Sequence, residues 1–344
     1  MKTTMAVRRS FATLLALLVV FAGTVSSVSA RSITTPGNAS VSAKYYTQLN
    51  NAEQQIYNKL HSFAQQKQGT SVKMNFSDSP IALSGPNWRK QLDLSLFRAF
   101  DAYRYDHPEV IWLYKISADN VVGTESENGS AKVEQFTVKF TLNPHNQASE
   151  QPAVIAAMDD LMKNVDTSGS RYDQLASLYV AIGEWMDYNY SVTEVQTGRA
   201  GMRSQQVTSA LIDRYTVCAG YAKAFKMGAD RLGIPAISVS GTAVGYDGSV
   251  AHMWNMVQME DGKWYAVDIT WDDQSNGMVS DTFFLVGADT MVLGSTGFAQ
   301  THIQGTSAMV TNISGFTVPQ MSSQRYTTPQ GYLNVTGEPV AVVA

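Results

Sequence analysis

Residues 216–222 read TVCAGYA and contain Cys218, the one cysteine in the 344-residue chain. A single cysteine has no disulfide partner within its own chain, so its thiol is either a small buried hydrophobic group or a reactive one. His252 follows within AHMWN (residues 251–255), and Asp268 follows within VDITW (residues 267–271). Cysteine, histidine and aspartate are the parts of a thiol nucleophile, its base and the group that orients the base. The sequence therefore predicts that Cys218, His252 and Asp268 form a catalytic triad.

The residues after the cysteine predict a helix from Cys218 to Leu232. This helix should end at Gly233, because glycine is favoured just past a helix and Pro235 blocks its continuation. The unpaired N–H groups and the dipole at a helix N-terminus stabilise a thiolate, which is the nucleophilic form of cysteine. The alanine and glycine after the cysteine let a substrate carbonyl approach the sulfur and leave backbone N–H groups available to bind an oxyanion.

His252 and Asp268 flank a predicted β-hairpin whose turn contains EDG at residues 260–262. With a two-residue turn, Asp268 would face Asn255 and His252 would point to the other side of the sheet. With a three-residue turn, Asp268 would pair with Trp254 and lie diagonal to His252 on one face, within reach of its side chain. Glycine suits the left-handed position that closes such a turn. Apolar residues on both faces leave the register open, and the triad hypothesis predicts the three-residue turn.

The first thirty residues predict a signal peptide. Lys2, Arg8 and Arg9 give a positive start, residues 11–23 form a short apolar run, and VSA at 28–30 provides the small residues of a cleavage site. The run is short for a membrane span, so an uncleaved anchor is the less favoured alternative. We expect a secreted or cell-surface protein that begins near Arg31 and is not bound to a membrane after cleavage.

Composition and charge exclude several classes of protein. Without residues 1–30 the chain keeps 22 basic against 29 acidic residues, a net charge of −7, which argues against a nucleic-acid partner. One cysteine excludes a disulfide framework and a cysteine-rich zinc site. The five histidines show no pair at metal-ligand spacing, and no glycine-rich phosphate loop follows a strand. We therefore expect neither a metal nor another cofactor.

The pattern along the chain predicts an α+β protein with a signal peptide at 1–30, an N-terminal α+β domain at 31–150, a catalytic domain at 151–300 and a C-terminal extension at 301–344. Apolar residues at helical spacing and alternating apolar residues locate the elements. Helices are expected at 46–63, 94–105, 151–162, 172–188, 209–213 and 218–232. Strands are expected at 110–116, 133–142, 236–242, 253–259, 264–269 and 283–286, with a polar loop at 120–131.

Four linked motifs carry a family resemblance: VCAGYA at 217–222, LGIP at 232–235, HMWN at 252–255 and WYAVDITW at 264–271. With spacings of 34 and 16 residues between the three triad positions, they resemble the transglutaminase-like superfamily over roughly residues 170–290. The resemblance implies a papain-like core in which a helical lobe, with the nucleophile helix, packs on an antiparallel sheet. Calcium-binding segments of the large animal transglutaminases are not recognisable, which again predicts no metal.

The resemblance implies a secreted enzyme whose thiolate attacks a carboxamide or peptide carbonyl, forms an acyl-enzyme and releases it to an amine or to water. Amine release gives crosslinking. The first alternative is a cysteine peptidase or amidase acting on extracellular or cell-wall peptides. The second is a non-catalytic extracellular binding protein that keeps the fold. The expected partner is a protein or peptide substrate, cell-wall peptides included, and the oligomeric state stays open.

Each triad residue also has a purely structural interpretation. Cys218 would be a buried core residue, His252 a satisfied core histidine, and Asp268 a cap for the turn before Thr270. His302 is predicted to lie on the surface.

Overall fold

The computed structural model describes residues 45–66, 69–143, 148–192, 199–245, 248–273, 278–305, 315–331 and Val335. The predicted signal peptide and the residues up to position 44 lie outside this part of the chain. Within the described residues, none of the helices is both long enough and apolar enough for a membrane span.

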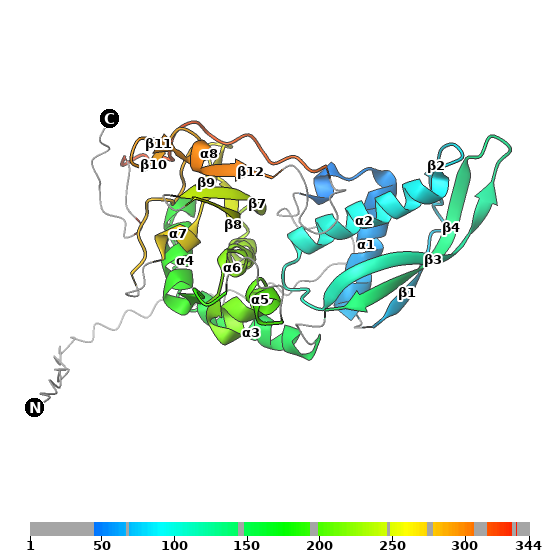
Figure 1. Cartoon of the computed structure of the whole chain (residues 1–344), viewed down its shortest axis with the longest axis horizontal. Helices are drawn as coiled ribbons and strands as arrows, with labels where there is room; N and C mark the ends of the chain where they lie inside the picture. Colours follow the sequence, from blue (N-terminus) through cyan, green and yellow to red (C-terminus); the bar gives the residue numbers. More distant parts are fainter. Residues whose placement is uncertain are drawn as a thin grey trace, which may run out of the picture. The chain divides into compact units, whose positions relative to one another are not determined.

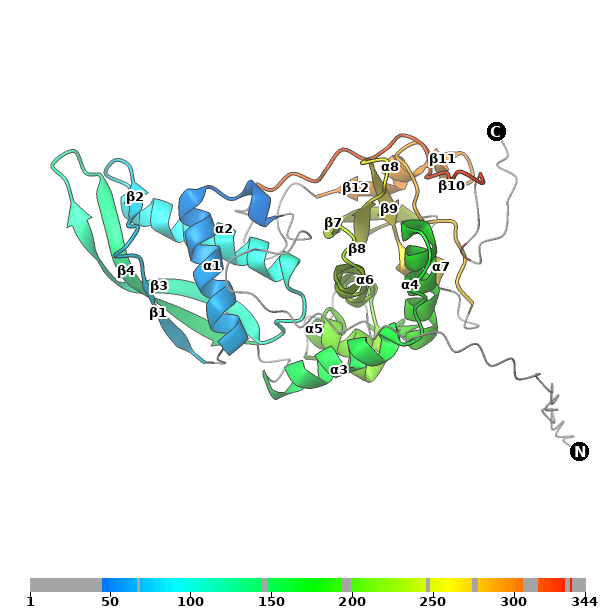
Figure 2. The ribbon, with the colours of Figure 1, turned by 180° about the vertical axis from the view of Figure 1, so that it is seen from behind.

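A four-stranded antiparallel sheet covered on one face by two helices forms the N-terminal half (Figures 1 and 2). Strand β4 pairs with β3 along one edge and with β1 and β2 along the other. Helix α1 buries Ile56, Leu60 and Phe63 at the helical spacing that the sequence shows. The elements are a short 3-10 turn at Tyr46–Gln48, α1 (Asn51–Gln66), β1 (Ser71–Asn75), β2 (Ile81–Leu83), α2 (Trp88–Asp106), β3 (Leu113–Glu125) and β4 (Ala131–Leu142).

Three predictions for this half need correction. The helix expected at 46–63 is interrupted, because Leu49 has an extended backbone before α1 begins. The helix expected at 94–105 begins six residues earlier, at Trp88. The polar loop expected at 120–131 is wrong, since β3 continues to Glu125 and pairs with β4 as far as Ala131. Polar residues fill this outer part of the hairpin because it is largely exposed to solvent.

The C-terminal half is a helical lobe packed on a second antiparallel sheet, in the strand order β12-β7-β8-β9. Helix α6 packs against β7 and β8 on one side and against α3 and α4 on the others (Figures 1 and 2). The mixed α and β class and the predicted placement of the nucleophile helix on an antiparallel sheet are confirmed. The helices are α3 (Gln151–Met162), α4 (Arg171–Trp185), α5 (Arg199–Ser204), a π turn (Ser209–Asp213), α6 (Cys218–Leu232), α7 (Ile269–Asp272) and α8 (Phe298–Thr301). The strands are β5 (Asp187–Tyr188), β6 (Tyr215–Thr216), β7 (Ala236–Gly245), β8 (Gly248–Gln258), β9 (Trp264–Val267), β10 (Met291–Leu293), β11 (Thr296–Gly297) and β12 (His302–Gln304).

Local signals explain where the helices of this lobe begin and end. Ser170 caps α4 in a capping box with Asp173, so the breaker run before the helix becomes its start. The predicted helix at 172–188 ends earlier, at Trp185, because the following residues pair with β6 as strand β5. Helix α6 runs as predicted and ends at Gly233, which is left-handed.

The β8–β9 hairpin has the register that the triad hypothesis requires. Gln258 pairs with Trp264 and Asn255 with Val267, so the turn contains three residues. Gly262 closes it with a φ of 76°. The predicted three-residue turn is therefore confirmed.

The strand predicted at 283–286 is wrong. Leu285 has a φ of 50°, which interrupts the extended backbone. Val286 makes a single bridge to Ala266 of β9, and the Phe283 carbonyl accepts a hydrogen bond from the Asp268 N–H. This segment therefore borders the sheet without extending it as a strand.

The described residues all fall within one compact unit, residues 37–344. The Tyr45 hydroxyl of the N-terminal half donates a 2.7 Å hydrogen bond to the Ser238 carbonyl of β7. Tyr105, near the end of α2, packs against Ala219 and Ala222 of α6. The predicted domain boundary near residue 150 stays a prediction.

Candidate active site

Cys218 is the first residue of α6 and lies on the side that faces the sheet. Its N-cap residue, Val217, provides no side-chain cap for the helix N-terminus. The thiol is nearly enclosed, with 9% of the residue exposed. This position supplies the uncapped helix start on which the predicted nucleophile depends.

His252 and Asp268 meet beside the sheet. His252 lies on β8, and Asp268 follows β9, where its backbone adopts the N-cap position of α7. The Nε2 atom of His252 lies 2.6 Å from Oδ2 of Asp268. The other oxygen, Oδ1, accepts a 3.0 Å hydrogen bond from the Thr270 N–H. Asp268 is thus both a cap and a partner of the imidazole, so its two sequence-based interpretations are compatible.

The electrostatics of the pair favour an imidazolium and a carboxylate. Burial acts against a charge on His252, but the Asp268 charge and the hydrogen bonds with Asp268 and Cys218 outweigh it and raise the pKa of His252 to about 10. Burial alone would raise the pKa of Asp268, but the charge and hydrogen bond of His252 and a hydrogen bond from His302 hold it well below its usual range. The ion pair therefore persists through neutral pH.

The three predicted residues form one connected group. Nε2 of His252 is directed to Asp268, and the Cys218 thiol is another of the groups that raise the pKa of the same imidazole. An imidazolium next to a cysteine stabilises the thiolate, which is the form that attacks a carbonyl. The arrangement has the parts needed for nucleophilic attack by sulfur and for later proton donation by histidine.

His302 is a fourth member of this group, and its predicted surface position is wrong. The residue is 2% exposed, and its Nε2 lies 3.0 Å from the same Asp268 oxygen that contacts His252. Strand β12 brings it there by pairing with β7, His302 opposite Ala243. No sequence signal indicated this, because β12 has three residues and its partner strand lies about sixty positions earlier.

Aromatic rings enclose the buried end of the site. His302 stacks on Phe298 with ring centroids 4.1 Å apart, and Trp271 lies 4.7 Å from it. Trp254 lies 5.2 Å from His302 and 6.2 Å from His252. This apolar surround excludes water from the carboxylate and strengthens the ion pair.

Two further aspartates hold the turn after Asp268. Asp272 is fully buried and accepts hydrogen bonds from the Tyr179 and Ser280 hydroxyls and from the Phe283 N–H. Asp273 accepts from the Tyr221 hydroxyl of α6. Both carboxylates therefore tie α7 to the helices of the lobe.

His252, Asp268 and His302 are also the described side chains whose donor atoms lie close enough to share a metal ion, all within 4.8 Å of one another. Their mutual hydrogen bonds of 2.6 and 3.0 Å account for this closeness without an ion. The expectation that the protein needs no metal and no other cofactor stays a prediction.

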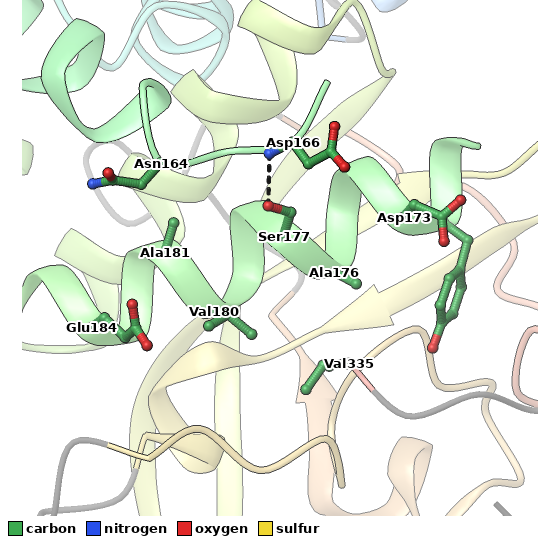
Figure 3. A pocket seen from close by; sticks show the side chains of 10 residues that line it. Asn164, Asp166, Asp173, Ala176, Ser177, Val180, Ala181, Glu184 and Val335 are labelled. Carbon is green, nitrogen blue, oxygen red and sulfur yellow. Dashed lines mark hydrogen bonds between the residues drawn. The ribbon is translucent and has the colours of Figure 1, made fainter. Parts of the chain in front are cut away.

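A pocket on the outer side of α4 lies away from this group (Figure 3). Its lining includes the carboxylates of Asp166, Asp173 and Glu184, and the Ser177 hydroxyl accepts a 2.8 Å hydrogen bond from the Asp166 N–H. None of the candidate triad residues lines it, so it offers no entry to the thiol.

Comparisons with known proteins find a family match within the C-terminal half. The model of the transglutaminase-like superfamily matches residues 158–269. No curated protein matches the chain. Among solved structures, one described as a TGase shares 14% identity with a TM-score of 0.32, and the match covers 44% of this chain and 44% of that one. The periplasmic domain of TgpA from Pseudomonas aeruginosa shares 18% identity with a TM-score of 0.25, over 59% of this chain and 70% of that one.

The family match contains Cys218, His252 and Asp268 and ends before His302. The expected resemblance is confirmed over this range. Residues 158–269 form a domain of the transglutaminase-like superfamily.

Proposed function

We propose that the protein is a thiol acyl-transfer enzyme that acts on a carboxamide or peptide carbonyl through an acyl-enzyme. The observation that carries this proposal is the buried group of Asp268, His252 and Cys218, with the thiol at the uncapped start of α6. A core cysteine and a core histidine would not need a buried carboxylate 2.6 Å from the imidazole. Burying a charged pair is unfavourable unless its geometry is good, so a functional role explains it better than stability does.

Acylation starts with the thiolate of Cys218 and the imidazolium of His252. The sulfur attacks the carbonyl carbon, a C–S bond forms and the carbonyl electrons move to the oxygen. N–H groups at the start of α6 stabilise this oxyanion. The carbonyl then re-forms, the C–N bond breaks, and His252 donates its proton to the leaving nitrogen. A carboxamide substrate releases ammonia, and a peptide bond releases an amine.

Deacylation reverses the role of the imidazole. Neutral His252 accepts a proton from the incoming amine or water, which attacks the thioester carbon. The C–S bond then breaks and the electron pair returns to the sulfur. Asp268 keeps the ring oriented throughout and stabilises the imidazolium in each half-reaction. We propose transfer to an amine as the principal reaction, with hydrolysis as its competitor.

One assay separates these reactions. Protein without its first thirty residues is incubated with a glutamine-containing peptide, with and without a primary amine, and products are followed by mass spectrometry. Incorporation of the amine supports transfer. Ammonia or a cleaved peptide bond without incorporation supports the amidase or peptidase alternative. If no peptide is consumed and no acyl-enzyme mass appears, the protein is a binding protein and the catalytic proposal fails.

Cys218→Ala and Cys218→Ser provide the controls for this assay. Because the chain has one cysteine, these variants remove every thiol in the protein. Activity that survives in Cys218→Ala would contradict the proposed nucleophile. A slow residual acylation in Cys218→Ser would agree with it, because serine keeps an oxygen nucleophile of lower reactivity in the same place.

We also propose that the protein is exported and acts on proteins or peptides outside the cell, cell-wall peptides included. The support is the charged, apolar and small-residue sequence of the first thirty residues. Expression in a bacterial host, followed by fractionation and N-terminal sequencing, tests this proposal. A mature form that begins near Arg31 outside the cytoplasm is expected, and an intact N-terminus in the cytoplasm would overturn it.

A further inference from the structure

His302 is hydrogen-bonded to the candidate triad through its Nε2 atom. Its Nε2 lies 3.0 Å from Oδ2 of Asp268, and its Nδ1 lies 2.9 Å from the Thr301 hydroxyl. His252 reaches the same Oδ2 at 2.6 Å. The carboxylate of Asp268 therefore has three partners, two imidazoles on Oδ2 and the Thr270 N–H on Oδ1.

Hydrogen-bond chemistry fixes the tautomer of His302. A carboxylate oxygen accepts only, so Nε2 must carry a proton to interact favourably with Asp268. The Thr301 hydroxyl has one proton and two neighbours, Nδ1 of His302 at 2.9 Å and the Phe298 carbonyl at 3.0 Å. The ring is neutral if this proton points to Nδ1, and cationic if it points to Phe298 while Nδ1–H donates to the hydroxyl oxygen. Burial favours the neutral form, and it lowers the pKa of His302 despite the neighbouring carboxylate. His302 therefore offers a neutral N–H to Asp268.

The surrounding structure holds this imidazole in one place. Phe298 stacks on it at 4.1 Å with the two planes 11° apart, and Trp271 and Phe283 contact other parts of the ring. Strand β12 lies close to β7 because position 241 is a glycine. A Cβ at Gly241 would collide with the backbone oxygen of Ile303. Gly241 also pairs with His252 on its other side, so one residue sets the distance between the strands that carry the two histidines.

We propose that His302 is a positioning residue that donates its Nε2–H to Asp268 and holds the carboxylate toward His252. This inference rests on the function proposed above for the same site. A neutral donor stabilises the Asp268 anion without placing a second cation beside His252, so the carboxylate keeps its direction and the charge stays on His252. Without this donor the carboxylate keeps the Thr270 bond on Oδ1 but can turn Oδ2 away from the imidazole.

Two substitutions of His302 separate a positioning role from a packing role. His302→Phe keeps an aromatic ring for Phe298 to stack on and removes the donor. His302→Gln removes the ring but keeps an N–H near the position of Nε2. We expect kcat of His302→Phe to fall by about 10- to 100-fold with KM within about twofold, since small misplacements of catalytic groups have effects of this size. We expect His302→Gln to recover most of the loss.

A packing role predicts the opposite order, with the phenylalanine variant active and the glutamine variant impaired. That order, or wild-type kcat in both variants, would overturn the proposal. Thr301→Val and Thr301→Ser give a second pair if His302→Phe does not fold. Loss of the hydroxyl in the valine variant should lower kcat several-fold, and serine should restore it.

Two measurements do not depend on amide turnover. Nitrogen-15 spectra should show His302 with Nε2 protonated and Nδ1 unprotonated from pH 6 to 8, and the reverse tautomer would refute the inference. Iodoacetamide labels only Cys218 in this chain, and its rate at pH 7 should be several-fold slower in His302→Phe than in wild type. If these two results hold while no amide is consumed, the proposed function fails and the positioning role stands.

Discussion

Nε2 of His252 lies 2.6 Å from Oδ2 of Asp268, and both residues are nearly inaccessible to solvent. The two atoms reach each other from adjacent strands of one hairpin, His252 on β8 and Asp268 just after β9. A charge pair in this enclosed position orients the imidazole and keeps it protonated. Removal of the Asp268 charge should therefore lower the rate of turnover, because the imidazole would lose its buried partner.

Asp268→Asn should lower kcat/KM by roughly 10²- to 10⁴-fold, since an amide keeps the volume but neither stabilises the imidazolium nor fixes its tautomer. The measurement is the rate of ammonia release from a glutamine peptide. Asp160→Asn is the matched control, because it makes the same change on an exposed helix position paired with Lys163. A rate for Asp268→Asn within threefold of wild type would show that the carboxylate has no role in turnover.

The stability contributed by His252 should depend on pH in a defined direction. Its pKa in the folded protein is about 10, above the value near 6.5 of a free histidine. Protonation of His252 therefore stabilises the fold fully below about pH 6.5, and this contribution is lost as the pH rises through about 10. Asp268, with its lowered pKa, contributes above about pH 4 and loses its contribution in acid.

The measurement is urea unfolding of wild type and His252→Gln at several pH values from 5 to 10. Glutamine keeps a hydrogen-bond donor but carries no charge at any pH. The difference in unfolding free energy should be largest near pH 5 to 6.5 and should shrink toward pH 10. A difference that grows with pH would mean that the imidazole is neutral in the folded protein.

Local signals in the sequence predicted the parts of the site that depend on one helix and one hairpin. The helix from Cys218 to Leu232 follows from an uninterrupted helical stretch closed by Gly233. The pattern of apolar residues could not predict the hairpin register, because apolar residues occupy both faces of β8 and β9. Requiring His252 to reach Asp268 selected the three-residue turn, and the register confirms it.

Contacts between distant segments could not be predicted in this way. His302 belongs to a three-residue strand whose pairing with β7 depends on the whole sheet, so no local pattern indicates its burial. Residues 283–286 have the composition of a strand, but Leu285 adopts a left-handed backbone as the chain passes beside β9. Tertiary packing overrides local propensity at both places.

Gly262→Ala should destabilise the fold by about 1 kcal/mol, because a side chain at a φ of 76° strains the turn. Nothing lies within 4 Å of a Cβ built there, so the effect would come from the backbone alone. Urea unfolding measures it. Lys263→Ala is the control, since that exposed side chain should change stability by less than about 0.5 kcal/mol. An alanine variant as stable as wild type would mean that another turn can close the hairpin in the same register.

Removal of metal ions should leave activity unchanged. The donor atoms of His252, Asp268 and His302 that could approach one ion already interact with each other at 2.6 and 3.0 Å, so no ion is needed to hold them together. The measurement compares amide turnover before and after dialysis against EDTA, with metal content followed by mass spectrometry.

Added Zn²⁺ provides the complementary test, because imidazole and carboxylate ligands suit this ion and its binding would displace the proton that His252 must donate. We expect Zn²⁺ to inhibit turnover reversibly and EDTA to restore it. Loss of activity after EDTA treatment, with recovery on addition of a single metal, would instead show that this group of residues holds a working ion.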